Sequence, residues 1–321
     1  MSDAILFVQL GSPADASPEN VEKYLVDFLG DPHTLGNPPF FWKWLLRFVI
    51  APRRAAKSAE KYRLMMEREA FGEMPLIHHT RKFAEGVSAY FRIPVRFAFE
   101  FGSRPSIGDS LSELSTLGVR NVCVVPLFPQ RSLVTTVAVR DLALAAFRKF
   151  PNLTMRFVDG FAMKNFFLDE ILRQILAVWD KKSSVVFSFH GTPLRWKLQG
   201  DPYADECLGE FEFWRKRLME IVPDAKIAMS FQSRLGPVKW LGPYTAEVLE
   251  ELGRRGESVL VVCPSFTADN LETLYEVDVE LKRKFLALGG KRFERVPCPN
   301  VSPEWIRSFA GELARDVGAL S

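Results

Sequence analysis

Eight short runs of apolar residues, rich in β-branched and aromatic types, alternate with segments of helical length, and this alternation constrains the fold most strongly. Several runs, such as NVCVVPLF and SVLVVC, are almost continuously apolar, as is typical of strands that helices cover on both faces. Such strands, alternating with amphipathic helices, predict parallel sheets with crossover helices. The expected strands span 5–10, 95–101, 121–127, 153–158, 184–189, 226–231, 258–263 and 292–297, and the clearest helices span 202–221, 243–254 and 271–288.

The length of 321 residues suits two domains or one large α/β unit, and eight strands divide naturally into four and four. We therefore expect the α/β fold class, with two Rossmann-like, doubly wound domains, each holding a four-stranded parallel sheet flanked by helices. The boundary is predicted near residue 150, so that the first domain spans 1–150 and the second spans 151–301. The last segment, 302–321, is expected to form a helix that packs back on the first domain.

Charge and motifs argue against several classes of function. The net charge of +3, without a long block of like charge, gives no reason to expect a nucleic-acid partner. The phosphate-binding patterns GxGxxG and GxxxxGK[ST] are absent from the sequence, so nucleotide binding has no support. No apolar run approaches the roughly 18 residues that a membrane-spanning helix needs.

The N-terminus and the cysteines predict a cytoplasmic protein. Met1 leads directly into an apolar run without a basic leader, so we expect no secretory signal. The four cysteines, at positions 123, 207, 263 and 298, form no CxxC pair and match the spacing of neither a zinc site nor an iron–sulfur cluster. Buried or free thiols in a reducing cytosol are therefore expected.

The residue after the strand at 184–189 is His190, followed by Gly, Thr and Pro. Ligands of open α/β sheets bind at the carboxyl ends of the strands, which is where this histidine is expected to lie. An imidazole with an ordinary pKa of about 6.5 can accept a proton or bind a metal ion. The alternative is a histidine that is simply hydrogen-bonded within a turn.

Acidic residues follow the strand at 258–263. Asp269 and Glu272 have the spacing of a capping box, which needs no chemistry. Glu272, Glu276 and Glu280 also recur at every fourth residue and form an acidic stripe, which suits either a solvated helix face or a path for a cation. One histidine with carboxylates is too few ligands for a closed structural metal site, but suits a transient site for a divalent ion.

The most apolar segment, FFWKWLLRFVIA at 40–51, is too short to span a bilayer and is broken by Lys43 and Arg47. It suits a core helix, a lip over an apolar ligand, or a surface that touches a membrane interface. Arg53 and Arg54 follow it. An apolar wall edged by arginines would suit a flat, apolar ligand that carries carboxylates.

The order of several short blocks resembles the ferrochelatase family over nearly the whole chain. Each block alone is weakly diagnostic, but the ordered set at family spacing is highly specific. The blocks are LGSP at 10–13, YLVDFLGDP at 24–32, PLFPQ at 126–130, SFHGTP at 188–193, FQSR at 231–234, WLGP at 240–243 and DNLETL at 269–274.

The resemblance implies an enzyme that inserts Fe²⁺ into a porphyrin with release of two protons, the terminal step of haem biosynthesis. It implies a porphyrin cleft between the two domains, an apolar lip at about 36–55, and protoporphyrin IX rather than coproporphyrin III as substrate. The family's catalytic residues fall on His190 and Glu272, and its metal path on His190, Glu272 and Glu276. The positions implied to contact porphyrin are Leu10, Arg53, Arg54, Phe128, Ser132, Pro193, Trp240 and Phe266.

The resemblance also sets expectations for partners. The partners are porphyrin and Fe²⁺, with no permanent cofactor and no iron–sulfur cluster. The chain would act as a monomer or homodimer, with peripheral contact to the inner membrane through the lip at 40–51.

The sequence departs from the family pattern at several positions. These are Asn270 where many members have histidine, Glu73 and Met74 where Gly-Ser is usual, Arg131 after PLFPQ, and Glu100 in a block where an arginine is usual. The departures leave two alternatives open. One is a degenerate member that binds porphyrin or haem without catalysis, and the other is a chelatase for a different metal and tetrapyrrole.

Overall fold

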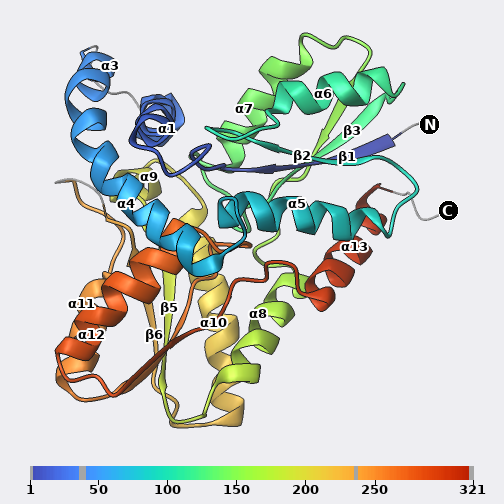
Figure 1. The fold of residues 1–321 in the computed structure, drawn as a ribbon. Helices are drawn as coiled ribbons and strands as arrows, with labels where there is room; N and C mark the ends of the chain where they lie inside the picture. The colour runs from blue at the N-terminus through green and yellow to red at the C-terminus, as the bar shows by residue number, and fades with distance from the viewer. Residues whose placement is uncertain (1–2, 36–40, 235–237, 318–321) are drawn as a thin grey trace. The chain divides into compact units, whose positions relative to one another are not determined.

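The computed structural model of the chain describes residues 3–35, 41–234 and 238–317. Its strands form two four-stranded sheets, and every strand pair in both sheets is parallel. Helices connect the strands, as the ribbon in Figure 1 shows. The predicted α/β fold, with two parallel four-stranded sheets flanked by helices, is confirmed.

The first unit holds the sheet with the strand order β2-β1-β3-β4. Its chain runs through residues 1–128, 133–160 and 306–321. The strands are β1 (Asp3–Gln9), β2 (Val95–Phe99), β3 (Asn121–Pro126) and β4 (Thr154–Phe157). The helices are α1 (Pro18–Gly30), α2 (Pro32–Leu35), α3 (Trp42–Leu45), the π-helix η1 (Leu46–Ile50), α4 (Ala51–Glu69), α5 (Pro75–Ser88), α6 (Ile107–Thr116), α7 (Thr136–Phe147) and α13 (Pro303–Val317), whose residues from Ile306 onward belong to this unit.

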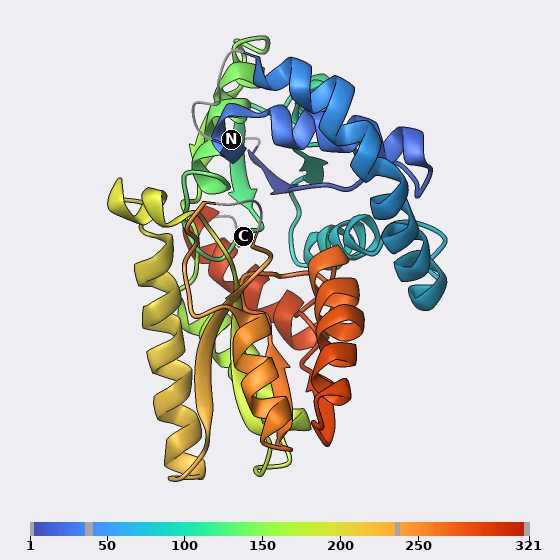
Figure 2. The ribbon, with the colours of Figure 1, turned by 90° about the vertical axis from the view of Figure 1, so that its left-hand side faces the viewer.

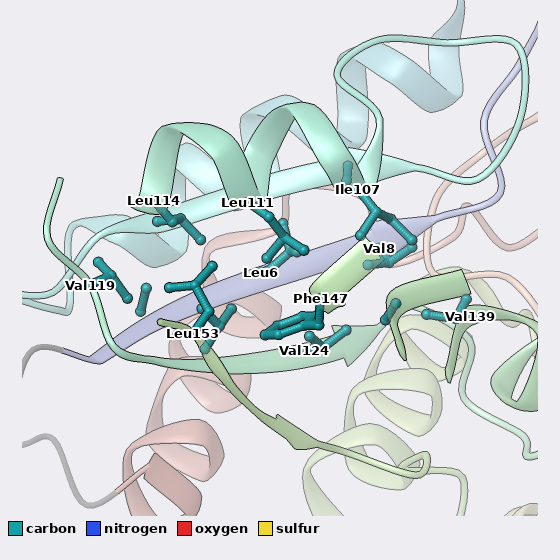
Figure 3. Close-up of a cluster of buried hydrophobic side chains, with 14 residues drawn as sticks. Leu6, Val8, Ile107, Leu111, Leu114, Val119, Val124, Val139, Phe147 and Leu153 are labelled. Carbon is teal, nitrogen blue, oxygen red and sulfur yellow. The ribbon is translucent and has the colours of Figure 1, made fainter. Parts of the chain in front are cut away.

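Both faces of the first sheet are buried, which explains its nearly continuous apolar strands. On one face, α6 and α7 cover Leu6, Val8 and Val124, as the close-up in Figure 3 shows. On the other face, the ring of Phe7 packs against Phe83 of α5 and Phe309 of α13, with ring centroids 5.3 and 5.9 Å away.

The second unit, residues 129–132 and 161–305, holds the sheet with the order β6-β5-β7-β8. The strands are β5 (Ser184–His190), β6 (Ile227–Gln232), β7 (Ser258–Val262) and β8 (Arg292–Arg295). The helices are α8 (Asn165–Val178), α9 (Leu194–Leu198), α10 (Tyr203–Ile221), α11 (Thr245–Arg254), the π-helix η2 (Glu272–Leu281) and α12 (Lys282–Ala287).

Helices cover both faces of the second sheet. On one face, Phe187 of β5 stacks on Trp214 of α10 with ring centroids 5.3 Å apart. On the other face, Leu249 of α11 and Phe285 of α12 pack against the strands. Figure 2 shows α10 on one side of this sheet and α11 with α12 on the other.

The boundary between the two units lies further along the chain than the predicted position near residue 150. β4 pairs with β3 in the first sheet, whereas a boundary near residue 150 assigned that strand to the second domain. The division falls between residues 160 and 161 instead. The segment 129–132, predicted in the first domain, belongs to the second unit.

Each sheet has a topological switch point, which is a pair of neighbouring strands whose following connections run to opposite edges of the sheet. In the second sheet this point lies between β5 and β7. The carboxyl ends of β5 and β7 carry the segments that begin at His190 and Pro264. The fold therefore brings the ends of these two strands to the edge where ligands bind in α/β sheets.

The described part of the apolar segment 40–51 forms α3, η1 and the start of α4, while residues 36–40 of the predicted lip lie outside the described residues. Leu46 is buried, and the Trp42 indole donates to the carbonyl of Leu29 at 3.0 Å. Trp44 and Phe48, however, are 61% and 60% exposed, so the segment is not a fully buried core helix. Among the described residues, no helix is both long and apolar enough to cross a membrane.

Candidate active site

The main chain of His190 is fixed at the carboxyl end of β5. Its N–H donates to the Ser265 hydroxyl at 3.1 Å, and its carbonyl accepts from the Tyr203 hydroxyl at 2.8 Å. The hydroxyls of Tyr203 and Ser265 also hydrogen-bond each other, at 2.7 Å. On the other side, His190 is in register with Gln232 of β6. These contacts hold the histidine backbone to the loops and strands around it.

The imidazole of His190 lies in an apolar environment. The ring of Phe266 meets it edge to face, with centroids 5.8 Å apart. The Nδ1 atom is buried and has no hydrogen-bond partner. Burial lowers the pKa of His190 to about 4, because desolvation disfavours the imidazolium. The side chain is therefore a neutral imidazole at pH 7, able to offer a nitrogen lone pair to a metal ion or a proton.

The segment that leads into η2 is held by Asn270, which corrects the predicted capping box. The Asn270 side-chain oxygen accepts from the main-chain N–H groups of Glu272 and Thr273, at 3.0 and 3.2 Å. Asp269 is instead buried in an ion pair with Arg295 at 2.7 Å. A buried arginine competes for this carboxylate more strongly than a helix N-terminus does, because the arginine would otherwise be a buried, unpaired charge.

Glu272 and Glu276 both belong to η2, where an α-helix had been predicted over 271–288. Hydrogen bonds of a π-helix run from residue i to residue i+5, so one turn holds more residues than a turn of α-helix. Side chains four positions apart then lie close to one line along the helix. The acidic stripe predicted from the sequence is therefore present on a π-helix, a conformation that is frequent at functional sites.

Burial raises the pKa of the Glu272 carboxyl from 4.5 to about 7, and the nearby charge of Glu276 adds to this effect. The main-chain carbonyl of Glu272 accepts from the Gln232 side chain at 3.3 Å. Gln232 is itself buried and accepts from the Ser188 hydroxyl at 2.7 Å. Since Gln232 is also the register partner of His190, it links the first turn of η2 to the end of β5.

The carboxylate of Glu276 is held by Ser233, the residue that follows β6. The main-chain N–H of Ser233 donates to one carboxylate oxygen at 2.9 Å, and its hydroxyl donates to the other at 2.6 Å. Neither Gln232 nor Ser233 is among the site residues predicted from the sequence. The signal was present, because both lie in the FQSR block directly after a strand.

The structure therefore brings His190, Glu272 and Glu276 to the carboxyl edge of the second sheet. They do not form a preassembled metal cluster. Within the ranges that the structure describes, no group of three or more His, Cys, Asp or Glu side chains is placed to hold a metal ion. The predicted metal residues thus lie on adjoining segments, connected through Gln232 and Ser233.

Three of the predicted porphyrin contacts lie in the second unit, which also holds His190. Pro193 and Trp240 face each other in an antiparallel bridge, beside a main-chain bond of 2.9 Å from Leu241 to Thr192. Phe266 contacts the histidine ring, as described above. A fourth, Ser132, donates its hydroxyl to the buried Asp201 at 2.9 Å, so at least one of its polar interactions is internal to the unit.

The other predicted porphyrin contacts lie in the first unit. Leu10 directly follows β1, and Phe128 packs against the core cluster of that unit. Arg54 is exposed on α4, and the neighbouring Arg53 donates to the carbonyl of Val49 at 3.2 Å. The porphyrin cleft expected between the domains remains a prediction.

Several departures from the family pattern have local structural roles. Asn270 caps the entry to η2, and Arg131 pairs with Glu206 through both its main-chain N–H, at 2.7 Å, and its guanidinium, at 2.5 Å. Glu73 accepts from Arg81 and contacts His78 at 3.0 Å. Glu100 differs, because its carboxyl oxygens are buried without hydrogen-bond partners and burial raises its pKa well above the usual range.

The fold of the chain is shared with solved chelatase structures. It is similar to SirB from Bacillus subtilis, solved with Fe³⁺, with a TM-score of 0.59 and 16% identity over 99% of this chain and 98% of that one. It is also similar to the sirohydrochlorin chelatase SirB from Bacillus subtilis subspecies spizizenii, solved with cobalt, with a TM-score of 0.57 and 14% identity over 100% and 98% of the two chains. At such low identity these similarities establish a chelatase-like fold.

Sequence relationships then give the family. The ferrochelatase family model matches residues 2–316. A ferrochelatase of Herminiimonas arsenicoxydans is 35% identical over 317 residues, which cover 96% of this chain and 84% of the relative. One from Francisella tularensis subsp. tularensis (strain WY96-3418) is 34% identical over 309 residues, covering 94% and 92%. The chain belongs to the ferrochelatase family, a group of lyase-class metal chelatases that insert a metal ion into a porphyrin.

Proposed function

We propose that the protein inserts Fe²⁺ into protoporphyrin IX, releases two protons, and so completes haem biosynthesis. The observation that carries this proposal is the pair of displaced pKa values at one sheet edge. His190 is kept neutral by a pKa of about 4, and Glu272 is brought to a pKa of about 7. Metal insertion needs both a neutral ligand for the cation and a group that takes up pyrrole protons near neutral pH.

His190 supplies the neutral imidazole. A ring that stays unprotonated at pH 7 can bind an incoming Fe²⁺ or accept a pyrrole proton without first losing a proton of its own. Its apolar neighbour Phe266 suits the face of a porphyrin, as do Trp240 and Pro193. Binding energy from such contacts over the macrocycle can be used to bend the ring and expose a pyrrole nitrogen.

Glu272 is the proton carrier in this proposal. A carboxyl with a pKa of about 7 exchanges protons readily at neutral pH, which the ordinary value of 4.5 would not allow. Glu276, four residues further along η2, then supplies a carboxylate that attracts the metal cation. Carboxylate oxygens and an imidazole nitrogen together form a ligand set that suits a borderline ion such as Fe²⁺.

Fe²⁺ is a substrate in this scheme, and no resident cofactor is proposed. The proposal includes no iron–sulfur cluster, and the four cysteines are buried as free thiols. The departures at Glu73, Asn270 and Arg131 are accounted for by local hydrogen bonds, which supports an active enzyme over a degenerate porphyrin carrier.

The test is an anaerobic assay with purified protein, Fe²⁺ and either protoporphyrin IX or coproporphyrin III, followed by the loss of free-base absorbance. Turnover that favours protoporphyrin IX would support the proposal. Faster turnover of coproporphyrin III would keep the chemistry and change the substrate. Tight binding of both porphyrins without insertion would favour the carrier.

The main-chain contacts of His190 give a first prediction. Tyr203→Phe removes the hydroxyl that donates to the His190 carbonyl and contacts Ser265. We expect kcat to fall about tenfold and the free energy of unfolding to fall by about 1–2 kcal/mol, since a partly buried carbonyl loses its donor. Insertion kinetics and thermal melts measure both, with Tyr90→Phe as the control because Tyr90 is exposed. Wild-type values for Tyr203→Phe would contradict this role.

The exposed rings at 41–48 support peripheral contact of a cytoplasmic enzyme, monomeric or dimeric, with the inner membrane. Phe41, Trp44 and Phe48 are exposed beside the basic residues Lys43 and Arg47. Exposed aromatic rings next to cations bind anionic lipid surfaces without spanning them. Such contact would help to collect an apolar substrate.

A second prediction tests this contact. Replacing Trp44 and Phe48 together by serine should weaken co-sedimentation with anionic phospholipid vesicles at least about tenfold, because two interfacial rings are lost. Leu198→Ser is the matched control, since Leu198 is 80% exposed in the second unit. Equal loss in the control and the double variant would mean that the segment at 41–48 has no special affinity for lipid.

A further inference from the structure

The contact between Ser233 and Glu276 has an unusual backbone. Ser233 has a φ of +62°, which lies in the left-handed region that residues other than glycine and asparagine rarely adopt. Such a conformation is strained for serine and persists where surrounding contacts require it. Here it lets one residue use both of its donors on one carboxylate, the N–H at 2.9 Å and the hydroxyl at 2.6 Å.

The two donors reach different oxygens of Glu276, so they fix the orientation of the carboxylate as well as its position. With a donor on each oxygen, the carboxylate cannot rotate without breaking at least one of the two hydrogen bonds. Glu272 lies four residues earlier on η2, and its main-chain N–H donates to the Asn270 side chain at 3.0 Å. The end of β6 therefore fixes the Glu276 carboxylate itself, whereas Asn270 holds Glu272 through its main chain.

We propose that Ser233 is a positioning residue that aims the Glu276 carboxylate for the metal ion. This inference rests on the proposed function and names the residue that orients Glu276 within the same site. The alternative is that Ser233 only turns the chain after β6. A turn residue at positive φ is served equally well or better by glycine, which adopts this conformation without strain.

The test compares Ser233→Ala with Ser233→Gly in the full chain under anaerobic conditions. Both variants remove the hydroxyl and keep the N–H, but only glycine relieves the backbone. A positioning role predicts that both raise the KM for Fe²⁺ about tenfold, the scale of one hydrogen bond to a charged group, while the KM for protoporphyrin IX stays unchanged. A turn role predicts that the glycine variant behaves as wild type.

Glu276→Gln completes the cycle. If Ser233 acts through Glu276, then Ser233→Ala adds no further increase in the KM for Fe²⁺ once Glu276 is glutamine. Additive effects, or a glycine variant with the wild-type KM, would overturn the inference while the proposed function stands. A wild-type protein that inserts no metal into either porphyrin would overturn the proposed function first, and this inference with it.

Discussion

Replacing His190 with alanine is expected to lower kcat for Fe²⁺ insertion by about a thousandfold, within the range that one positioned acid–base group or ligand contributes. The reason is the combination of position and protonation state. His190 ends β5 at the topological switch point, and its ring is kept neutral by burial, with a pKa of about 4. No other histidine lies in the second unit.

The measurement is the rate of metalloporphyrin formation, with porphyrin affinity followed separately by fluorescence quenching. Porphyrin affinity should change little, because removal of the imidazole leaves Trp240 and Phe266 in place. His78→Ala is the control, since His78 contacts Glu73 in the first unit. Near-normal turnover by His190→Ala with intact porphyrin binding would show that the catalytic assignment is wrong.

Glu272→Gln is expected to lower kcat by about a hundredfold or more, because glutamine keeps the shape of the side chain but cannot accept a proton at neutral pH. In the wild type, Glu272 must be ionised to act as acceptor. Its raised pKa therefore predicts that kcat rises with pH through about 7. The pH–rate profile of the wild type should show this acid limb, and the residual activity of the variant should not. A wild-type profile that is flat between pH 6 and 8 would contradict the role of Glu272.

The same substitution should stabilise the protein at alkaline pH, which gives a readout independent of catalysis. The folded-state pKa of about 7 lies above the ordinary value of 4.5, so the wild type loses stability as pH rises from 4.5 through 7. The loss amounts to about 3 kcal/mol once complete. Glutamine has no charge to bury. Denaturant unfolding should therefore show the variant more stable than wild type at pH 8 and little different at pH 4.5, and equal stability at both would contradict the burial of this carboxyl.

The fold followed from the sequence because its strands are marked by composition. The runs around Val124, Val186 and Val261 are buried on both faces, and such strands are apolar almost without interruption. The boundary between the units was harder to predict. β4, with the sequence TMRF, is an edge strand with alternating exposure, and nothing in its residues indicates which sheet it joins.

The sequence positions of the candidate site residues could be predicted, but the hydrogen bonds that hold these residues could not. The rule that ligands bind beyond the carboxyl ends of parallel strands located His190, and the family blocks located Glu272 and Glu276. The π-helical form of η2 depends on how 271–288 packs against the strands, which propensity does not encode. The two hydrogen bonds from Ser233 to Glu276 depend on a positive φ that serine rarely adopts. Asn270 caps η2 in place of Asp269, because Asp269 forms an ion pair with Arg295 of β8.

The central claim is that this chain moves a metal ion in and two protons out of a porphyrin at the edge that carries His190 and Glu272. The most direct measurement is a single turnover of Fe²⁺ and protoporphyrin IX under anaerobic, weakly buffered conditions, with absorbance and a pH indicator recorded together. The account predicts two protons released for each porphyrin metallated by the wild type, and neither signal at a comparable rate from Glu272→Gln. Porphyrin binding without metallation by the wild type, or equal rates from the variant, would contradict it.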